Sequence, residues 1–373
     1  MKIDRIDIYQ AYLPYAGGVY RLSGGRTYEG FDATFVRITT DTGLTGWGES
    51  TPFGATYIAA HAMGVRAGIA EIAPHLLGLD PRKSDRVYDT MDQALVGHWH
   101  AKTALDVACW DIFGQSVGLP VSELLGGGDG VPMPVISSIY AGDPEDMRTR
   151  VQQHRAKGYK GHSIKIGASQ SEGGPRLDAA RIEACLADAA ADELFIVDAN
   201  GGLSVEVALR LLKQLPSHLD FILEAPCRTW QEQKRLSQRC DTPLMIDELA
   251  QDDVSVLQMV QDQCADGISL KISKSGGLTQ GRRQRDICVA AGATISVQET
   301  VGSEVALAAL LHLGQTIPKH LLRCVLDTRD MVSLSISPLD APIKKGGILA
   351  PQSPGLGVSP SLEILGEPIQ SFH

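Results

Sequence analysis

The sequence predicts an α/β protein with two parts, a small α+β domain followed by a barrel of parallel strands. Three observations predict this fold. Residues 3–49 alternate apolar and polar side chains as antiparallel strands do, residues 60–125 change to a helical periodicity, and from about residue 131 short apolar runs alternate with amphipathic stretches. A length of 373 residues favours two domains over one.

The first part begins with a predicted three-stranded meander. Its strands are expected at residues 3–8, 34–39 and 44–49, with a hairpin turn at Asp41-Thr42-Gly43. A loop rich in Gly and Tyr, residues 17–25, separates the first two strands. A loop of this length inside a compact domain is usually functional or disordered.

Helical periodicity follows in residues 63–77 and again in residues 101–111. After these helices, the run Gly126-Gly127-Gly128 is a natural link to the next domain. The first part is therefore predicted to span residues 1–127.

The second part contains eight candidate strands, separated by amphipathic stretches such as residues 205–215 and 253–261. Alternation of this kind implies parallel strands joined by crossover helices, and seven or eight such units suggest a barrel over residues 128–349. Residues 350–373 are expected to fold back onto the N-terminal meander. The candidate strands are residues 131–138, 161–166, 194–198, 221–224, 244–247, 267–271, 293–297 and 321–325.

The composition excludes several classes of protein. Apolar residues make up 43% of the chain and the formal net charge is −10, so an extended disordered protein and a nucleic-acid binder are both poor descriptions. The charged N-terminus does not resemble a signal peptide, and no apolar stretch is long enough for a membrane helix. Seven scattered cysteines without a C-x-x-C pair fit free thiols, so a cytoplasmic location is expected.

Five charged residues end apolar runs at steps of 33, 26, 23 and 24 residues, about the length of a strand, a loop and a helix together. They are Lys165, Asp198, Glu224, Asp247 and Lys271. In a parallel barrel all strands end at one face, so these residues are expected to converge. Three acids suit a hard divalent cation, and two lysines could flank whatever that cation holds. The alternative for any one acid is a helix cap or a surface ion pair, and Lys165 alone could be a barrel-rim lysine.

Several short motifs follow one another in a specific order along nearly the whole chain, and together they resemble the enolase superfamily in its mandelate racemase and muconate lactonizing branch. The motifs are Gly46-Trp47-Gly48-Glu49, Ala104-Leu105-Asp106-Val107-Ala108-Cys109-Trp110-Asp111, Leu124-Leu125-Gly126-Gly127, Ile164-Lys165-Ile166-Gly167, Val197-Asp198-Ala199-Asn200, Leu223-Glu224-Ala225-Pro226, Ile246-Asp247-Glu248 and Leu270-Lys271-Ile272-Ser273-Lys274-Ser275-Gly276-Gly277.

The resemblance implies a modified TIM barrel, (β/α)7β, under an α+β capping domain. It also implies one Mg²⁺ per subunit on Asp198, Glu224 and Asp247, with Lys165 and Lys271 as acid/base groups on opposite faces of the substrate. The implied chemistry is removal of the proton next to a carboxylate, through an enediolate intermediate. The implied partner is a small-molecule carboxylate, and the protein is expected to be a homo-oligomer that binds neither nucleic acid nor membrane.

Within this branch the chain resembles enzymes of proline derivatives. This implies dehydration of cis-3-hydroxy-L-proline or a similar cyclic amino acid. The alternatives are 2-epimerisation of hydroxyproline betaine or proline betaine, a dipeptide epimerase and a cycloisomerase. Relatives that hold a methylated amine often carry a Trp after the seventh strand, where this chain has Val301, and this weakens the betaine reading.

One residue departs from the family pattern. The second-strand motif is often Lys-x-Lys, but here it is Ser163-Ile164-Lys165. Ser163 therefore stands where a lysine would contact the substrate carboxylate, which we interpret as a clue to the substrate. The same loss is the one observation in favour of a second hypothesis, a non-catalytic barrel relative that serves for binding or structure.

Two residues are predicted to support the metal site. Asn200 could approach the metal or be a turn residue, and Glu248 competes with Asp247 for the third ligand position. The family pattern favours Asp247, with Glu248 as a supporting partner. Lys271 ends its strand and is preferred over Lys274, which is expected in the following loop, in solvent.

Four further residues are candidate substrate contacts. Tyr20, Asp32 and Tyr57 lie in or near predicted loops of the capping domain, and Glu299 ends the seventh strand, where it could meet an amine or a hydroxyl. For each of them the alternative is an exposed loop residue without a role in binding. Asp327, after the eighth strand, is a candidate substrate contact with the same alternative as Glu299. The pair His98 and His100 resembles a metal motif only superficially, so a structural or surface role is preferred.

Overall fold

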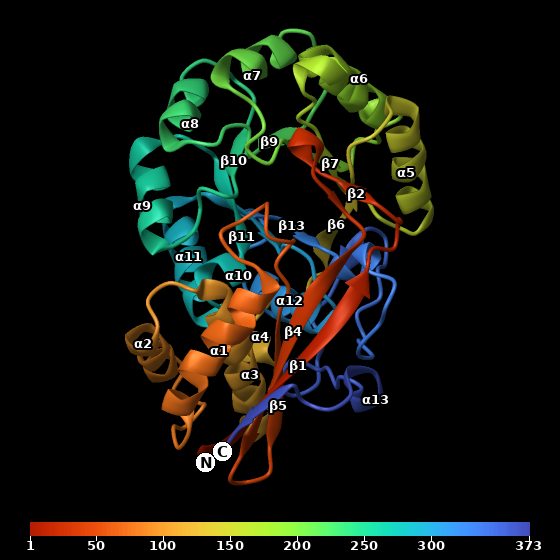
Figure 1. The fold of residues 1–373 in the computed structure, drawn as a ribbon. Helices are drawn as coiled ribbons and strands as arrows, with labels where there is room; N and C mark the ends of the chain where they lie inside the picture. The colour runs from red at the N-terminus through yellow and green to blue at the C-terminus, as the bar shows by residue number, and fades with distance from the viewer.

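The computed structural model describes residues 1–373 and shows two parts that pack side by side (Figure 1). The N-terminal part has an antiparallel sheet in the order β15-β1-β4-β5, covered by helices. The predicted meander, its hairpin at Gly43 and the first helix are confirmed. The strands and helices of this part are β1 (Ile3–Pro14), β2 (Tyr20–Arg21), β3 (Thr27–Tyr28), β4 (Gly30–Thr40), β5 (Thr45–Ser50), α1 (Ala62–Leu76), α2 (Ser84–Ala94), α3 (Trp99–Val117) and α4 (Val121–Leu124).

The second part is a closed parallel barrel of eight strands, β6 to β13, in which β13 pairs with β6 to close the ring. Seven helices link consecutive strands and no helix of this kind follows β13, so the (β/α)7β prediction is confirmed. The strands are β6 (Met133–Ile139), β7 (Gly161–Lys165), β8 (Leu194–Asp198), β9 (Ile222–Glu224), β10 (Leu244–Ile246), β11 (Gly267–Lys271), β12 (Thr294–Gln298) and β13 (Leu322–Leu326).

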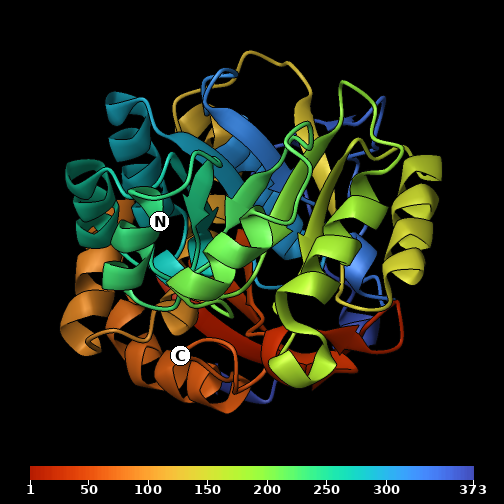
Figure 2. The same ribbon diagram turned by 90° about the horizontal axis from the view of Figure 1, so that it is seen from above.

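The linking helices form the outer ring of the barrel, as the view from above shows (Figure 2). They are buried on the side that meets the strands, as a crossover helix must be in a parallel sheet. The helices are α5 (Pro144–Ala156), α6 (Gly174–Leu186), α7 (Val205–Leu212), α8 (Trp230–Ser237), α9 (Asp253–Asp262), α11 (Leu278–Ala291) and α12 (Glu304–Gly314), with a one-turn helix α10 (Ile272–Ser275) before α11.

The C-terminal segment returns to the N-terminal part. Its last strand, β15 (Gln370–Phe372), pairs with β1, so the C-terminal residues lie beside the N-terminal strand (Figure 1). The short strand β14 (Gly347–Ile348) pairs with β6, and α13 (Leu362–Leu365) is a single turn.

Helix α3 joins the two parts through buried polar side chains. Asp106 accepts hydrogen bonds from the backbone N–H of Thr279 at 3.0 Å and from its hydroxyl at 2.5 Å, and the Trp110 indole donates to the same hydroxyl. Asp111 accepts from the backbone N–H groups of Trp47 and Leu356. The motif at residues 104–111 is therefore used for docking between domains, since each buried carboxylate is satisfied by a partner on another element.

Two glycines of the motif at residues 46–49 allow α3 to approach β5. A Cβ on Gly46 would lie 2.3 Å from the carbonyl oxygen of Ala108, and one on Gly48 would lie 2.0 Å from that of Ala104. Only glycine permits this contact between a strand and a helix backbone.

Candidate active site

The barrel places a row of charged side chains at one end of its interior. Lys165 pairs in register with Asp198, and Asp198 pairs with Glu224, on neighbouring parallel strands. Side chains that are paired in this way point to the same face of the sheet. Asp247 follows directly on Ile246, the last residue of β10.

The two lysines stand on opposite sides of the barrel. Lys165 ends β7 and Lys271 ends β11. In the closed order β6 to β13 these strands lie four positions apart in a ring of eight. The three strands between them, β8, β9 and β10, are the ones that carry or precede the acids. The acids therefore form one wall of the site, with a lysine at each end.

Asp198, Glu224 and Asp247 form a compact acidic triad. Each offers one carboxylate oxygen, and these oxygens all lie within 4.8 Å of one another. The residues are 0%, 0% and 1% exposed. Hard divalent cations prefer carboxylate oxygens, and three buried carboxylates this close together need a positive partner. The donor set therefore fits a cation such as Mg²⁺.

The ammonium groups of the two lysines neutralise two members of the triad. Lys165 forms an ion pair with Asp198, and the Nζ of Lys271 lies 2.5 Å from Oδ2 of Asp247. Burial lowers the pKa of each lysine, but the carboxylates outweigh burial and raise both pKa values above the ordinary value. Glu224 has no ammonium contact of its own, and burial together with Asp198 and Asp247 raises its pKa to about 8.

The backbone is strained next to two of these acids. Asn200 has φ of 46° and Ala225, which follows Glu224, has φ of 41°. Both values lie in the left-handed region, which costs most for a residue with a Cβ and no polar side chain. Asn200 offsets part of this cost, because its backbone N–H donates to Oδ1 of Asp198 at 2.8 Å and its amide donates to Oδ2 at 3.0 Å.

Neutral donors fix the Glu224 carboxylate. The Ser269 hydroxyl donates to Oε1 of Glu224 at 2.5 Å, and the Gln298 amide donates to the same oxygen at 3.2 Å. Ser269 lies within β11, and Gln298 is the last residue of β12. Hydrogen bonds of this kind orient a carboxylate that could bind a metal.

A cavity of about 350 Å³ opens above the charged row. Barrel residues form its floor, and aromatic and apolar side chains from the N-terminal part and from the segment after β13 cover it. The Tyr20 hydroxyl bonds to the Ser138 hydroxyl at 2.7 Å and ties the cover to β6. The lining residues are Tyr20, Leu22, Phe53, Tyr57, Ser138, Ser163, Lys165, Asn200, Lys271, Gln298, Glu299, Thr300, Leu326 and Met331.

Tyr57 contacts the charged row directly. Its hydroxyl donates to Oδ2 of Asp247 at 3.1 Å and accepts from Nζ of Lys271 at 3.1 Å and from the Asn200 amide at 3.3 Å. Burial raises the pKa of Tyr57 well above its ordinary value, so the hydroxyl keeps its proton. A residue of the N-terminal part thus contacts a catalytic candidate of the barrel.

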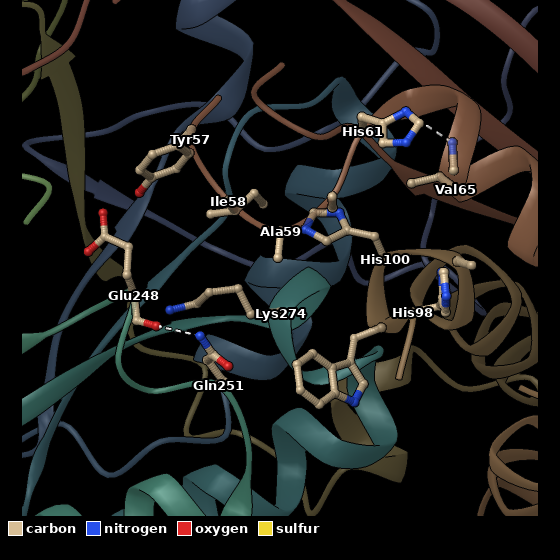
Figure 3. A pocket seen from close by; sticks show the side chains of 14 residues that line it. Tyr57, Ile58, Ala59, His61, Val65, His98, His100, Glu248, Gln251 and Lys274 are labelled. Carbon is tan, nitrogen blue, oxygen red and sulfur yellow. Dashed lines mark hydrogen bonds between the residues drawn. The ribbon is translucent and has the colours of Figure 1, made fainter. Parts of the chain in front are cut away.

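A larger groove of about 1210 Å³ lies on the other side of Tyr57 (Figure 3). It runs between the segment at residues 57–61, helices α1 and α3, and the barrel side chains Glu248, Gln251 and Lys274. Tyr57 lines both the groove and the cavity and separates them.

Sequence comparisons agree with this architecture. The pattern described as "Enolase C-terminal domain-like" matches residues 146–364, and the pattern described as "Mandelate racemase / muconate lactonizing enzyme, N-terminal domain" matches residues 26–126. The chain belongs to the enolase superfamily. The predicted resemblance is confirmed, and the molecule is an enzyme of the mandelate racemase/muconate lactonizing group by descent.

Three relatives illustrate the range of this superfamily. The cis-3-hydroxy-L-proline dehydratase of Roseibium aggregatum is 34% identical over 372 residues and all of both chains. The N-succinyl-L-Arg/Lys racemase of Bacillus cereus is 29% identical over 84% of each chain. A crystal structure from Roseovarius nubinhibens, assigned to the mandelate racemase/muconate lactonizing enzymes and complexed with magnesium, is 55% identical over all of both chains, with a TM-score of 0.98.

In this enolase-superfamily chain, one of the predicted substrate contacts, Asp32, does not line the cavity. It lies on β4, and Arg66 of α1 holds it in a bidentate ion pair, with 2.9 Å to each carboxylate oxygen. Asp32 does not line the cavity, because this ion pair holds its carboxylate on the sheet. The other predicted contacts, Tyr20, Tyr57, Ser163 and Glu299, all line it.

The solvent-exposed position expected for Lys274 is wrong. Lys274 is 6% exposed and forms an ion pair with Asp247. It belongs to α10, which follows β11 without an intervening loop and so returns the side chain to the site.

The sequence alone did not distinguish Glu299 from Asp327 as a substrate contact, but in the structure only Glu299 lines the cavity. Glu299 accepts hydrogen bonds from Ser273 and from the backbone N–H of Thr300, and it lines the cavity. Asp327 is paired with Arg329 away from the cavity.

The remaining polar candidates also have defined places. Glu248 is partly buried, accepts a hydrogen bond from the Asn200 amide at 3.4 Å and lines the groove, while Asp247 completes the triad. Burial raises the pKa of Glu248 to about 7. His100 bonds to the Ser50 hydroxyl and His98 precedes α3, and neither belongs to an acidic or metal-like cluster.

Sequence reasoning missed Ser269, Gln298, Ser138 and Phe53. Three of them are inward-facing polar residues within strands, where an apolar residue is more usual. A polar residue at an interior barrel position was the signal that could have identified them.

Proposed function

We propose that this chain is an Mg²⁺-dependent enzyme that removes the proton next to the carboxylate of a small cyclic amino acid. Dehydration of cis-3-hydroxy-L-proline or a close analogue is the proposed reaction. The observation that carries the proposal is the buried triad on one wall of the cavity with Lys165 and Lys271 at its two ends.

The cation would be held by Asp198, Glu224 and Asp247. A divalent cation there would supply positive charge that stabilises the developing negative charge on the substrate carboxylate and lowers the pKa of the nearby ammonium groups. The solved relative that was crystallised with magnesium supports this choice of ion.

The two lysines provide the proton transfers. Lys165 and Lys271 both line the cavity, and they approach it from opposite strands of the barrel. A neutral lysine on one side can accept the proton from the carbon next to the carboxylate. The other lysine, as an ammonium group, can give a proton to a hydroxyl on the neighbouring carbon as the bond to that hydroxyl breaks, so that water leaves and a carbon–carbon double bond forms in the ring.

The wall opposite the triad favours an amino acid. When the substrate carboxylate faces the triad, its far side meets Glu299 of the β12 end and the apolar Leu326 and Met331. Glu299 is buried, so its carboxylate can pair with a ring ammonium group in a water-poor setting.

A 2-epimerase of a proline derivative is the second candidate. The specific observation in its favour is that both lysines reach the cavity, since epimerisation removes a proton on one face and returns one on the other. A betaine substrate is less favoured, because Val301 is 1% exposed and does not line the cavity, so no aromatic ring from the end of β12 faces a methylated nitrogen.

One experiment separates the candidates. The purified enzyme with Mg²⁺ is incubated in D₂O with cis-3-hydroxy-L-proline and, separately, with proline and the two betaines, and the products are followed by NMR and mass spectrometry. Loss of one water from hydroxyproline supports dehydration, whereas deuterium at the α-carbon of an inverted product supports epimerisation. Lys165→Met and Lys271→Met serve as inactive controls. Exchange or water loss that persists in the double variant, or that does not depend on Mg²⁺, would contradict the proposal.

A further inference from the structure

Lys274 is a buried ammonium group that the proposed proton transfers do not use. Its Nζ donates to Oδ1 of Asp247 at 2.6 Å, to the backbone carbonyl of Asp247 and to the backbone carbonyl of Ser269 at 3.4 Å. An ammonium group has three N–H donors, so these three acceptors occupy all of them. Lys274 therefore has no donor left for a substrate.

Lys271, three residues earlier at the end of β11, has a different environment. Its Nζ contacts the other oxygen of the same carboxylate, Oδ2 of Asp247, together with the Tyr57 hydroxyl. Lys271 lines the cavity, whereas Lys274 lines the groove behind it. In Figure 3, Lys274 extends from its helix toward the segment that carries Glu248, the neighbour of Asp247. The two oxygens of Asp247 are thus divided between a lysine in the cavity and a lysine outside it.

The contacts of Lys274 also restrict rotation of the Asp247 carboxylate. Asp247 lies just beyond the end of β10, where no strand pairing holds it. Lys274 binds its carboxylate and its own backbone carbonyl, and it connects both to Ser269 of β11. Rotation of the carboxylate that turns Oδ1 toward the other acids would break the ion pair in a buried setting, which is costly.

We infer that Lys274 is a positioning residue that holds Oδ1 of Asp247 away from the cation, so that Asp247 binds through one oxygen only and the site selects Mg²⁺ over Ca²⁺. The inference rests on the proposed function. Mg²⁺ requires a near-octahedral shell of six ligands, whereas Ca²⁺ accepts six to eight oxygens and readily takes a bidentate carboxylate. A triad member restricted to one oxygen disfavours the larger ion.

The test is the ratio of Ca²⁺ to Mg²⁺ affinity, measured by calorimetry on the full-length protein. Loss of one positive charge changes the affinity for both divalent ions in the same direction, so the ratio reports geometry. We expect Lys274→Met to shift the ratio toward Ca²⁺ by about tenfold, the scale on which outer partners of a metal ligand act. Lys271→Met removes the same charge from Oδ2 and is the matched control, in which the ratio stays within about threefold. An unchanged ratio in Lys274→Met overturns the inference.

If Lys274→Met does not fold, a crystal structure of the wild-type protein with Mg²⁺ still tests whether Asp247 binds the ion through one oxygen. The inference requires Lys274 on Oδ1 of Asp247 and only the other oxygen on the ion. Two Asp247 oxygens on the ion, or a Lys274 that has left the carboxylate, overturns it. A wild-type protein that binds neither cation contradicts the proposed function itself, which is a distinguishable failure.

Discussion

The Glu49 carboxylate of β5 lies on the N-terminus of α12 and accepts hydrogen bonds from the backbone N–H of Ser303 at 3.0 Å and from its hydroxyl at 2.5 Å. Thr51 donates to the same carboxylate at 2.6 Å, and the backbone N–H of Ala306 donates at 3.2 Å. A carboxylate at this place satisfies free N–H groups of the helix and meets the positive end of its dipole. The last motif residue of the N-terminal sheet therefore caps a helix of the barrel.

Replacing Glu49 is expected to loosen the contact between the two parts. Glu49→Gln places an amide N–H₂ group against N–H donors in a buried site, and we expect a loss of about 2–3 kcal/mol in the free energy of unfolding. Urea denaturation followed by circular dichroism measures this loss. Glu71→Gln, on the exposed face of α1, is the control and is expected to change stability by less than about 0.5 kcal/mol. Equal stability of the two variants would refute the capping role.

Gly277 is expected to tolerate no side chain. Its φ is 119°, and a Cβ would lie 2.3 Å from the Asp106 carboxylate. Gly277→Ala should therefore lose about 2–4 kcal/mol of stability, from strain and from the displaced carboxylate together. Gly292→Ala is the matched control, because Gly292 also has a positive φ, 70°, but open space around it. Its loss should be about 1 kcal/mol, and a similar loss at both positions in thermal unfolding would show that the Asp106 contact is unimportant.

Asp106 gives the protein a specific pH dependence. Burial raises the pKa of Asp106 to about 7, whereas the unfolded chain releases this proton near pH 4. Between these values the folded state binds one more proton than the unfolded state, so the contribution of Asp106 to stability is largest below pH 4 and declines as the pH rises to about 7.

Asp106→Asn removes this dependence while keeping a shape close to the protonated acid. The stability difference between wild type and variant is expected to shift against the wild type by up to about 1.4 kcal/mol for each pH unit between 5 and 7. Urea denaturation at several pH values measures it, with the exposed Asp4→Asn as control. A difference that stays flat over this range would show that Asp106 is ionised in the folded protein.

Ser269 is expected to tune metal binding without touching the metal. Ser269→Ala removes the 2.5 Å hydrogen bond to Glu224, so Mg²⁺ affinity should fall by about tenfold. Ser296→Ala is a fair comparison, because Ser296 is also a buried barrel serine but bonds to Gln298 and Cys324 and to none of the three acids. Calorimetry should show its affinity within about twofold of wild type. The same weakening in both variants would point to a general loss of packing.

Glu299 is expected to bind the amine of the substrate. Glu299→Gln keeps the size of the side chain and removes its charge, so KM for a cyclic amino acid should rise by about tenfold, with kcat reduced much less. Steady-state kinetics with cis-3-hydroxy-L-proline checks this. A large fall in kcat at unchanged KM would instead assign Glu299 to the chemical step.

The barrel and its charged row could be predicted because strand ends in a parallel barrel share one face. Because each of Lys165, Asp198, Glu224 and Lys271 ends an apolar run, that rule predicts that they lie at the same face of the barrel. In the structure each ends its strand, and Lys165, Asp198 and Glu224 are paired in register on neighbouring strands. Helix α2 was not predicted, because its sequence SDRVYDTMDQA is mostly polar and only three of its residues are buried. The loop predicted at residues 17–25 contains β2, which pairs with β3 just beyond the loop, and Tyr20 and Leu22 of this loop line the cavity.

The wrong predictions for Asp32 and Lys274 have a common cause. Each side chain contacts a residue that is distant in sequence, and the order of residues along the chain does not reveal such contacts. Asp32 is held by Arg66 of another element, and Lys274 is turned inward by a helix that begins directly after its strand. The serine that donates to Glu224 is a small residue in a strand, with no neighbouring motif to mark it. The expected homo-oligomer and the role of each site residue stay predictions.

The pairing of β15 with β1 has a consequence for synthesis of the chain on the ribosome. The edge strand of the N-terminal sheet comes from residues 370–372, which are translated after the whole barrel, and Leu356, which donates to Asp111 of α3, also emerges after the barrel strands. The newly made N-terminal part therefore keeps an unprotected sheet edge while the barrel is being translated, a state in which exposed edges favour association between chains. Joining the two ends and opening the chain at a surface loop instead would let this part finish early, and such a permuted gene should give less aggregated protein at high expression.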